Sequence, residues 1–167
     1  KEDKRNTYEG LIYSSGSELD IRVGPKNIGR ALRFMDTLIK TLRTRGHEIQ
    51  IKGGKTYVII FEEDYVIWLR ERLKKVKIQR EHWDYTEKSP GGVLTFRINE
   101  YHYYSKEWAD GKHPLESRLP SILASLELMA KKRHDERKVY EIQRLEQKEK
   151  ERLAKEIQDR KEEELLN

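Results

Sequence analysis

Between residues 25 and 46, apolar residues recur at intervals of three and four, and this spacing predicts an amphipathic helix. Pro25 suits the first turn of a helix, where a missing N–H costs nothing. Gly46 suits the left-handed position just past a helix, so we expect the helix to end there. The predicted apolar stripe consists of Ile28, Ala31, Leu32, Met35, Leu38, Ile39 and Leu42.

Two runs of the kind found in strands follow, and Gly53 and Gly54 separate them. A Gly-Gly pair between such runs predicts a tight hairpin, since both central positions need a positive φ. This turn sets Ile49 opposite Val58. We expect the helix to cover one face of the hairpin, and a second layer or a partner to cover the other. The first face carries Ile49, Ile51, Val58 and Ile60, and the second carries Tyr57, Ile59 and Phe61.

Shorter alternating runs predict further strands on both sides of this unit. Residues 11–13 and 19–23 predict one or two leading strands. Residues 62–64, all acidic, are interpreted as a solvated turn, and a third strand is predicted from residue 65, although residues 70–78 also fit a helix locally. We expect a polar connection over residues 82–92, followed by a fourth strand. That strand places Leu94, Phe96 and Ile98 on one face.

From Pro114 onward the pattern is helical, with apolar residues at three-four spacing up to Met129. Beyond Lys131 the apolar positions thin out and charged residues dominate. Pairs such as Glu146 and Lys150 lie four residues apart with the acid first, and each adds roughly 0.2–0.5 kcal/mol to a helix. Such pairs can hold a solvated helix without a partner, and a loose seam of apolar positions can equally pair two copies.

These elements together predict an α+β fold. We expect a four- to five-stranded antiparallel sheet with the amphipathic helix 25–46 on one face. The helix starting near residue 115 is expected to cover part of the other face and then to extend into solvent. The predicted organisation is a flexible lead-in at 1–10, an α+β domain at 11–130 and a charged helical extension at 131–167.

Composition adds limits to this picture. Charged residues make up 39% of the chain and hydrophobic residues 35%, and the imbalance is concentrated after residue 130. No run approaches the ~18 consecutive apolar residues of a membrane span, and the lack of cysteine excludes a disulfide scaffold. We therefore expect a cytoplasmic protein without a membrane partner. Because the chain begins at Lys1 rather than methionine, we also expect a region upstream of it.

The sequence offers no catalytic, metal or cofactor site, and we expect a non-catalytic protein. The five histidines (His47, His82, His102, His113 and His134) do not fall at metal-ligand spacing. An enzyme of unrecognised type stays open as an alternative only if His82, His102 and His113 converge in space. The string Gly53–Thr56 matches the end of a phosphate-binding loop, but a strand follows it where that loop requires a helix. The aromatic loop from Tyr101 to Trp108 either stacks unpaired bases or plugs the end of the sheet, and the packing role is favoured.

A net charge of +5 permits contact with nucleic acid. The candidate contacts lie on the outer side of the predicted helix, where a row of cations on a rigid element can bind phosphates. They are Lys26, Arg30, Arg33 and Lys40. The alternative interpretation is an ordinary solvated helix face.

Several strings resemble a group of uncharacterised bacterial proteins: RALRFMDTLIKTLRTRGHEIQI, LRERLKK, WDYTEKSPGGVLTFRI and WADGK before a highly charged helix. The resemblance covers roughly residues 28–165 and concerns the C-terminal half of those proteins, whose N-terminal half often looks like a helix-turn-helix region. It implies an accessory or oligomerisation domain of a bacterial DNA-associated protein. The alternative is a protein–protein interaction module that acts through residues 131–167, either with a second copy or with another protein.

Overall fold

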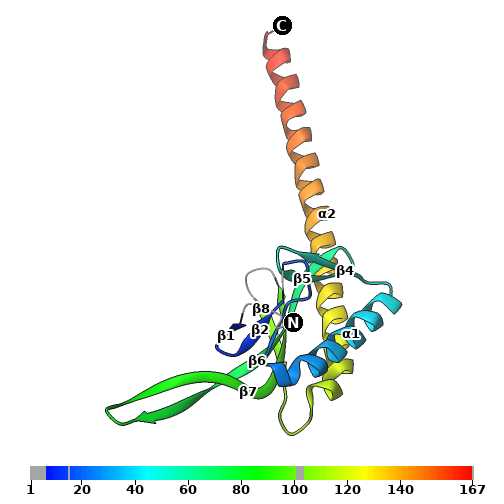
Figure 1. Cartoon of the computed structure of the whole chain (residues 1–167). Helices are drawn as coiled ribbons and strands as arrows, with labels where there is room; N and C mark the ends of the chain where they lie inside the picture. The colour runs from blue at the N-terminus through cyan, green and yellow to red at the C-terminus, as the bar shows by residue number, and fades with distance from the viewer. Residues whose placement is uncertain (1–6, 15, 101–103, 167) are drawn as a thin grey trace.

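The protein is described by a computed structural model that covers residues 7–14, 16–100 and 104–166, and it is an α+β protein (Figure 1). Two α-helices, α1 (Ile28–Thr44) and α2 (Leu119–Leu166), are each preceded by a short 3-10 helix, η1 (Pro25–Asn27) and η2 (Leu115–Arg118). The strands are β1 (Thr7–Tyr8), β2 (Leu11–Tyr13), β3 (Ile21–Val23), β4 (Glu48–Lys52), β5 (Lys55–Ile60), β6 (Glu63–Arg80), β7 (Trp83–Glu100) and β8 (Tyr104–Ala109).

The predicted amphipathic helix is confirmed as η1 and α1. Its buried face matches the predicted stripe with one exchange. Leu32, which we placed on the stripe, is 51% exposed, whereas Phe34 is buried and contacts Phe96 of β7 at 5.6 Å between ring centroids. Leu32 stands at the margin of the stripe and lines a groove with Ile28 and Ile51.

The hairpin of β4 and β5 is confirmed in its turn and its register. Gly53 and Gly54 both have positive φ, and Lys52 pairs with Lys55, so that Ile49 lies opposite Val58. Val58 is fully buried. The Gly-Gly turn therefore fixes which side chains face the helix.

The sheet is mixed and larger than predicted. It joins eight strands of the described residues in the order β1-β2-β3-β6-β5-β4, with β7 and β8 following on the other edge of β6. All pairings are antiparallel except that of β3 with β6, which is parallel. The prediction of a four- to five-stranded antiparallel sheet is thus only partly correct. Within the expected lead-in, residues 1–6 lie outside the described part and Thr7–Tyr8 pair with β2.

The polar connection expected over residues 82–92 is wrong. This segment is the first half of β7, which pairs with β6 from Arg80↔Trp83 inward. The two strands project from the sheet as a long ribbon (Figure 1). We call residues 73–90 the arm.

At the base of the arm, the register shifts between Glu71 and Leu73. The buried carboxylate of Glu71 accepts hydrogen bonds from the backbone N–H groups of Gly24, at 2.8 Å, and Gly92, at 2.7 Å. A bulge of this kind bends a ribbon and increases its twist. Through these two hydrogen bonds, Glu71 links the bent base of the arm to Gly24, just before η1 and α1.

Both helices lie on the same face of the sheet, so our expectation that the C-terminal helix covers the opposite face is wrong (Figure 1). The core forms between them and the inward side chains of β5, β6 and β7. Its fully buried members include Val58, Ile67, Leu69, Leu94, Phe96, Ile98, Leu115, Ile122 and Leu126. Since side chains alternate along a strand, the opposite face carries a separate set of residues, which neither helix covers.

Our interpretation of residues 62–64 as a solvated turn is wrong at Glu63, although Glu62 and Asp64 are exposed. The side chain of Glu63 is 7% exposed and lies between the guanidinium groups of Arg133 and Arg137 of α2, with N–O distances of 3.1 and 3.2 Å. The reversal of the chain occurs one residue earlier, at Phe61 and Glu62, which both have positive φ. The acidic run therefore holds α2 to the sheet.

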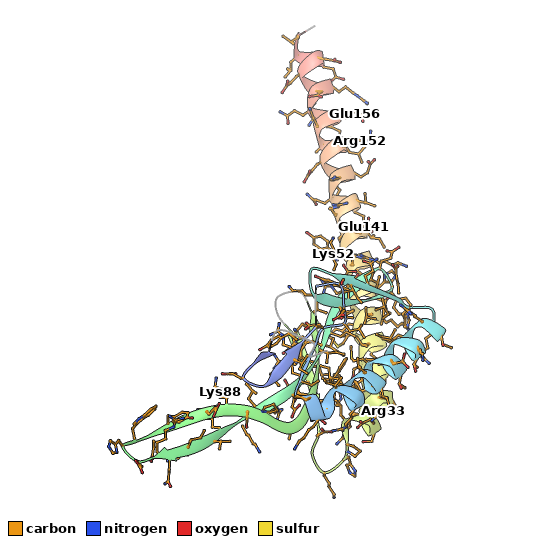
Figure 2. All side chains as sticks on the ribbon, viewed as in Figure 1. Arg33, Lys52, Lys88, Glu141, Arg152 and Glu156 are labelled. Atoms are coloured by element: carbon orange, nitrogen blue, oxygen red, sulfur yellow. The ribbon has the colours of Figure 1, made fainter. Side chains whose placement is uncertain are left out.

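Beyond these arginines, α2 leaves the body of the protein, and residues 135–166 are exposed (Figures 1 and 2). Charged side chains such as Glu141, Arg152 and Glu156 stand clear of the sheet along this part. Among the described residues, neither helix combines the length and apolar character that crossing a membrane requires.

Candidate nucleic-acid interface

Arg30, the central residue of the predicted phosphate-binding face of α1, is engaged by two carboxylates of the same chain. Arg30 donates two hydrogen bonds to Asp110, of 2.7 and 2.6 Å, and two to Glu116, both of 2.6 Å. Only 27% of its side chain is exposed. Hydrogen bonds to Glu116 and Asp110 raise the pKa of Arg30 above its usual value, so the guanidinium stays charged, and these two carboxylates balance its charge within the fold. Arg30 is a structural residue.

The sequence could not place these partners, since Asp110 and Glu116 lie 80 and 86 residues farther along the chain. Asp110 follows β8 and also accepts hydrogen bonds from the backbone N–H groups of Leu94 and Leu115. Burial on its own would raise the pKa of Asp110, but the hydrogen bonds from Arg30 and these two N–H groups outweigh it and leave the pKa lowered. The carboxylate thus joins α1, β7 and η2 at one point.

The other three predicted residues remain exposed on or beside α1. Lys40 forms an ion pair of 2.7 Å with Asp36, one turn earlier on the same helix. Lys26 and Arg33 make no ion pair with a residue of the described chain, and Figure 2 shows Arg33 at the outer side of α1. This face keeps two unneutralised cations rather than a row of four.

A richer cluster of cations lies on the arm. We call Lys74, Lys75, Lys77 and Arg80 the basic run of the arm. All four are exposed, and none forms an ion pair within the described chain. They follow one another along a single strand that extends away from the body (Figure 1). Three lysines close together in a run with strand-like alternation could have indicated this cluster from the sequence. The possibility that residues 70–78 form a helix made that pattern hard to recognise.

Cross-strand register divides the arm into two faces, because directly paired residues project to the same side. Lys75 pairs with Lys88 and Lys77 pairs with Thr86, so one face is polar and basic. Lys88 (labelled in Figure 2) also reaches Glu9 near β1, with an N–O distance of 3.5 Å. The other face carries Val76, Ile78, Tyr85 and Trp83 together with Lys74 and Arg80.

The tip of the arm is an ordered aromatic cluster. The rings of Trp83 and Tyr85 lie 5.2 Å apart between centroids, and the guanidinium of Arg80 lies 6.0 Å and 5.4 Å from them respectively. Trp83 is 59% exposed. An aromatic side chain so exposed at the end of an extended ribbon has no role in the core of this chain and is available to a ligand.

The aromatic loop from Tyr101 to Trp108 divides into two parts. Residues 101–103 lie outside the described residues, and the remainder belongs to β8. Trp108 packs against Phe96 at 6.3 Å between ring centroids, with the ammonium of Lys106 at 5.3 Å from its ring. At Trp108 the favoured interpretation, packing at the end of the sheet, is confirmed.

The histidines of the described residues have separate surroundings. His47 contacts Glu127 of α2 at 2.8 Å, His134 packs beside Phe61, and His82 and His113 are exposed on the arm and before η2. His102 lies outside the described residues. Within the part that the structure covers, no three His, Asp or Glu side chains come together as a metal would require.

Comparison with known proteins returns no relative: no family model, no curated protein and no solved structure matches the chain. The arm, the open sheet face and the long helix are therefore interpreted from their own chemistry.

Proposed function

We propose that this chain is a non-catalytic accessory domain of a DNA-associated protein, and that its arm contacts the phosphates of nucleic acid. The supporting observation is the basic run of the arm, four exposed cations without ion-pair partners in the described chain, on a ribbon that extends from the body. Lys26 and Arg33 of the α1 region supply further positive charge on the body. Arg30 has no part in this proposal, since two carboxylates occupy it.

The shape of the arm suits this role. The major groove of B-form DNA is about 12 Å wide and admits a two-stranded β-ribbon. In such a position the basic face that includes Lys75 and Lys77 lies toward one phosphate backbone. The bacterial origin, and a helix-turn-helix region upstream that reads the sequence, belong to the same proposal and rest on the resemblance of residues 28–165 to bacterial proteins.

Salt-dependent binding of a DNA duplex of about 20 base pairs tests the proposal. The observed binding constant falls with salt with a logarithmic slope of about −0.9 per phosphate contacted. We expect the triple variant K74E/K75E/K77E to weaken binding and to reduce the slope by about 2 to 3. A matched control, K148E/K150E/K155E, makes the same charge change on the exposed part of α2.

The control variant should bind like the unchanged chain, because its lysines lie far along the helix and away from the arm (Figure 1). Equal losses in both variants would mean that net charge alone drives binding, and the arm would then have no specific role. A salt-independent or absent interaction of the unchanged chain with duplex DNA would refute the proposal.

A second candidate function is a protein–protein interaction module that acts through the charged C-terminal helix. The observation that favours it is a stripe of exposed apolar side chains beyond the body: Val139, Ile142, Leu145, Leu153 and Ile157. Apolar positions at such spacing on a solvated helix are typical of a coiled-coil seam. In this second candidate function, the apolar stripe packs against the same stripe of a second copy or against another protein.

Sedimentation of the chain with and without residues 139–167 tests the second candidate. Truncation after Lys138 keeps Arg133 and Arg137, which hold α2 to Glu63, so the body should remain intact. An oligomer that becomes a monomer on truncation supports the interaction module. A monomer in both cases removes self-association, and DNA binding by the arm is unaffected by either result.

A further inference from the structure

The sheet face turned away from the two helices carries a polar hollow of about 660 Å³. Strands β5 and β6 contribute Tyr57, Trp68 and Arg70, whose neighbours along each strand point into the core. Strand β3 and the start of β5 contribute Arg22 and Lys55. A hollow of this volume falls in the size range of small-ligand sites, about 300–1,000 Å³.

The charge in the hollow is mostly positive. Arg22, Lys55 and Arg70 line it, and Asp20 is the one acidic lining residue among the described positions. Arg22 and Lys55 are exposed and make no ion pair with a residue of the described chain. Arg22 is held by the ring of Tyr13, with its guanidinium carbon 5.0 Å from the ring centroid. The hollow therefore attracts an anion.

The side chain of Arg70 is held in position by the buried carboxylate of Asp20. The Asp20 carboxylate, whose side chain is 9% exposed, accepts a 2.7 Å hydrogen bond from Nη1 of Arg70. Asp20 is itself fixed, because its backbone N–H donates to the buried hydroxyl of Thr56 at 2.9 Å. The Nε and Nη2 donors of Arg70 have no hydrogen-bond acceptor within the described chain, so they remain available to a ligand in the hollow.

Trp68 supplies an aromatic element between two cations. The guanidinium carbons of Arg70 and Arg97 each lie 4.7 Å from its ring centroid. Arg97 is the direct cross-strand partner of Trp68 on β7. Guanidinium groups and aromatic rings both stack on nucleobases, and cations beside them bind the phosphates.

We infer that this open face binds a nucleotide of single-stranded nucleic acid. Arg22, Lys55 and the Nε and Nη2 donors of Arg70 contact the phosphates, and the ring of Tyr57 stacks against the base. The site lies on the sheet, whereas the arm begins beyond Glu71, so the inference does not depend on the proposed function of the arm. Paired bases of a duplex present no free ring faces, and the site therefore selects unpaired strands.

Fluorescence anisotropy with end-labelled oligo(dT) tests the inference on the full chain, and a duplex of equal length serves as the second probe. The variant R22E/K55E reverses two exposed side chains of the hollow and should retain the fold. We expect it to weaken binding of the single strand by about tenfold or more while duplex binding by the arm changes little. Variant K74E/K75E/K77E should instead lose duplex binding and keep its affinity for oligo(dT).

Competition by a mononucleotide separates the two sources of this ligand chemistry. If AMP displaces the labelled strand at equal phosphate concentration, the hollow holds free nucleotides, and if it does not, the strand is required. Unchanged oligo(dT) affinity in R22E/K55E, or no oligo(dT) binding by the unchanged chain, would overturn the inference. Loss of duplex binding in K74E/K75E/K77E with oligo(dT) binding retained leaves the inference standing. If that variant loses both duplex and oligo(dT) binding, the arm binds both probes, which refutes the inference while sparing the proposed function.

Discussion

The guanidinium of Arg30 and the carboxylate of Asp110 face each other through two parallel N–H···O hydrogen bonds of 2.7 and 2.6 Å. Paired bonds of this type are shorter and stronger than neutral ones and fix orientation as well as distance. The pair joins the first turns of α1 to the segment that precedes α2. The two helices are thereby held in place on the same face of the sheet by a polar contact next to the core.

Removing the acid of this pair should be costly. In Asp110→Ala the Arg30 guanidinium loses two bonds, and the N–H groups of Leu94 and Leu115 lose their acceptor. We expect the free energy of unfolding to fall by about 2–4 kcal/mol. Urea denaturation measures it, and Asp36→Ala is the matched control, because its ion pair with Lys40 is exposed and worth about 0.5 kcal/mol or less. Similar losses in both variants would contradict this role of Asp110.

The lowered pKa of Glu127 makes the stability of the fold depend on pH. Hydrogen bonds from Arg45 and then from His47 lower the pKa of Glu127 to about 2, from an ordinary value of 4.5. A lowered pKa in the folded state stabilises the fold above the unfolded value, and this contribution is lost as the pH falls from about 4.5 toward 2. The pair is partly exposed, so we expect about 1 kcal/mol or less at neutral pH.

The measurement is the urea midpoint at a series of pH values for the unchanged chain and for Glu127→Gln. The variant should be less stable at neutral pH, and the difference should shrink through the acid range because the glutamine does not titrate. A constant difference between the two curves at every pH would show that Glu127 acts through packing rather than through its charge.

A third prediction concerns the base of the arm. A Cβ atom added at Gly91 would lie 2.7 Å from the backbone oxygen of Arg72, which cannot move without disturbing the paired strands. We expect Gly91→Ala to destabilise the protein by about 1–3 kcal/mol and to increase hydrogen exchange in the arm. Gly111→Ala is the control, since nothing lies within 4 Å of the added atom. Unchanged exchange in Gly91→Ala would mean that the bulge adapts freely.

Sequence periodicity was sufficient where the determining contacts are local. The apolar spacing around Met35 and Leu38 predicts α1 because one stripe must face the core, and the φ requirement at Gly53 and Gly54 fixes the register of the adjoining strands. The alternation of Leu94, Phe96 and Ile98 likewise placed them in the core, where all three are fully buried.

Most of the errors involve partners distant in sequence. A helical pattern shows which side of α1 faces away from the sheet, but not that Asp110 approaches Arg30 there. The same holds for Glu63, whose arginine partners on α2 lie some seventy residues later.

The arm was missed because Pro90, Gly91 and Gly92 normally indicate a loop, whereas here they form the bent base of a continuous strand. The polar hollow arises from β3 beside β6, a parallel pairing that no local pattern announces.

Glu63 and its two arginines yield the last prediction. Arg133 and Arg137 neutralise a carboxylate whose side chain is 7% exposed, and their removal in R133M/R137M leaves that charge buried without a partner. We expect a loss of about 3–5 kcal/mol in the free energy of unfolding at neutral pH, since an uncompensated buried charge costs more than a pair contributes.

The triple variant E63Q/R133M/R137M separates charge from packing. It lacks both the arginines and the buried charge, so it should recover much of the stability that R133M/R137M loses. Urea denaturation of the unchanged chain and of the two variants at neutral pH measures this. If the triple variant is no more stable than R133M/R137M, the arginines hold α2 through their aliphatic stems, and the attachment of the helix is a matter of packing rather than of charge.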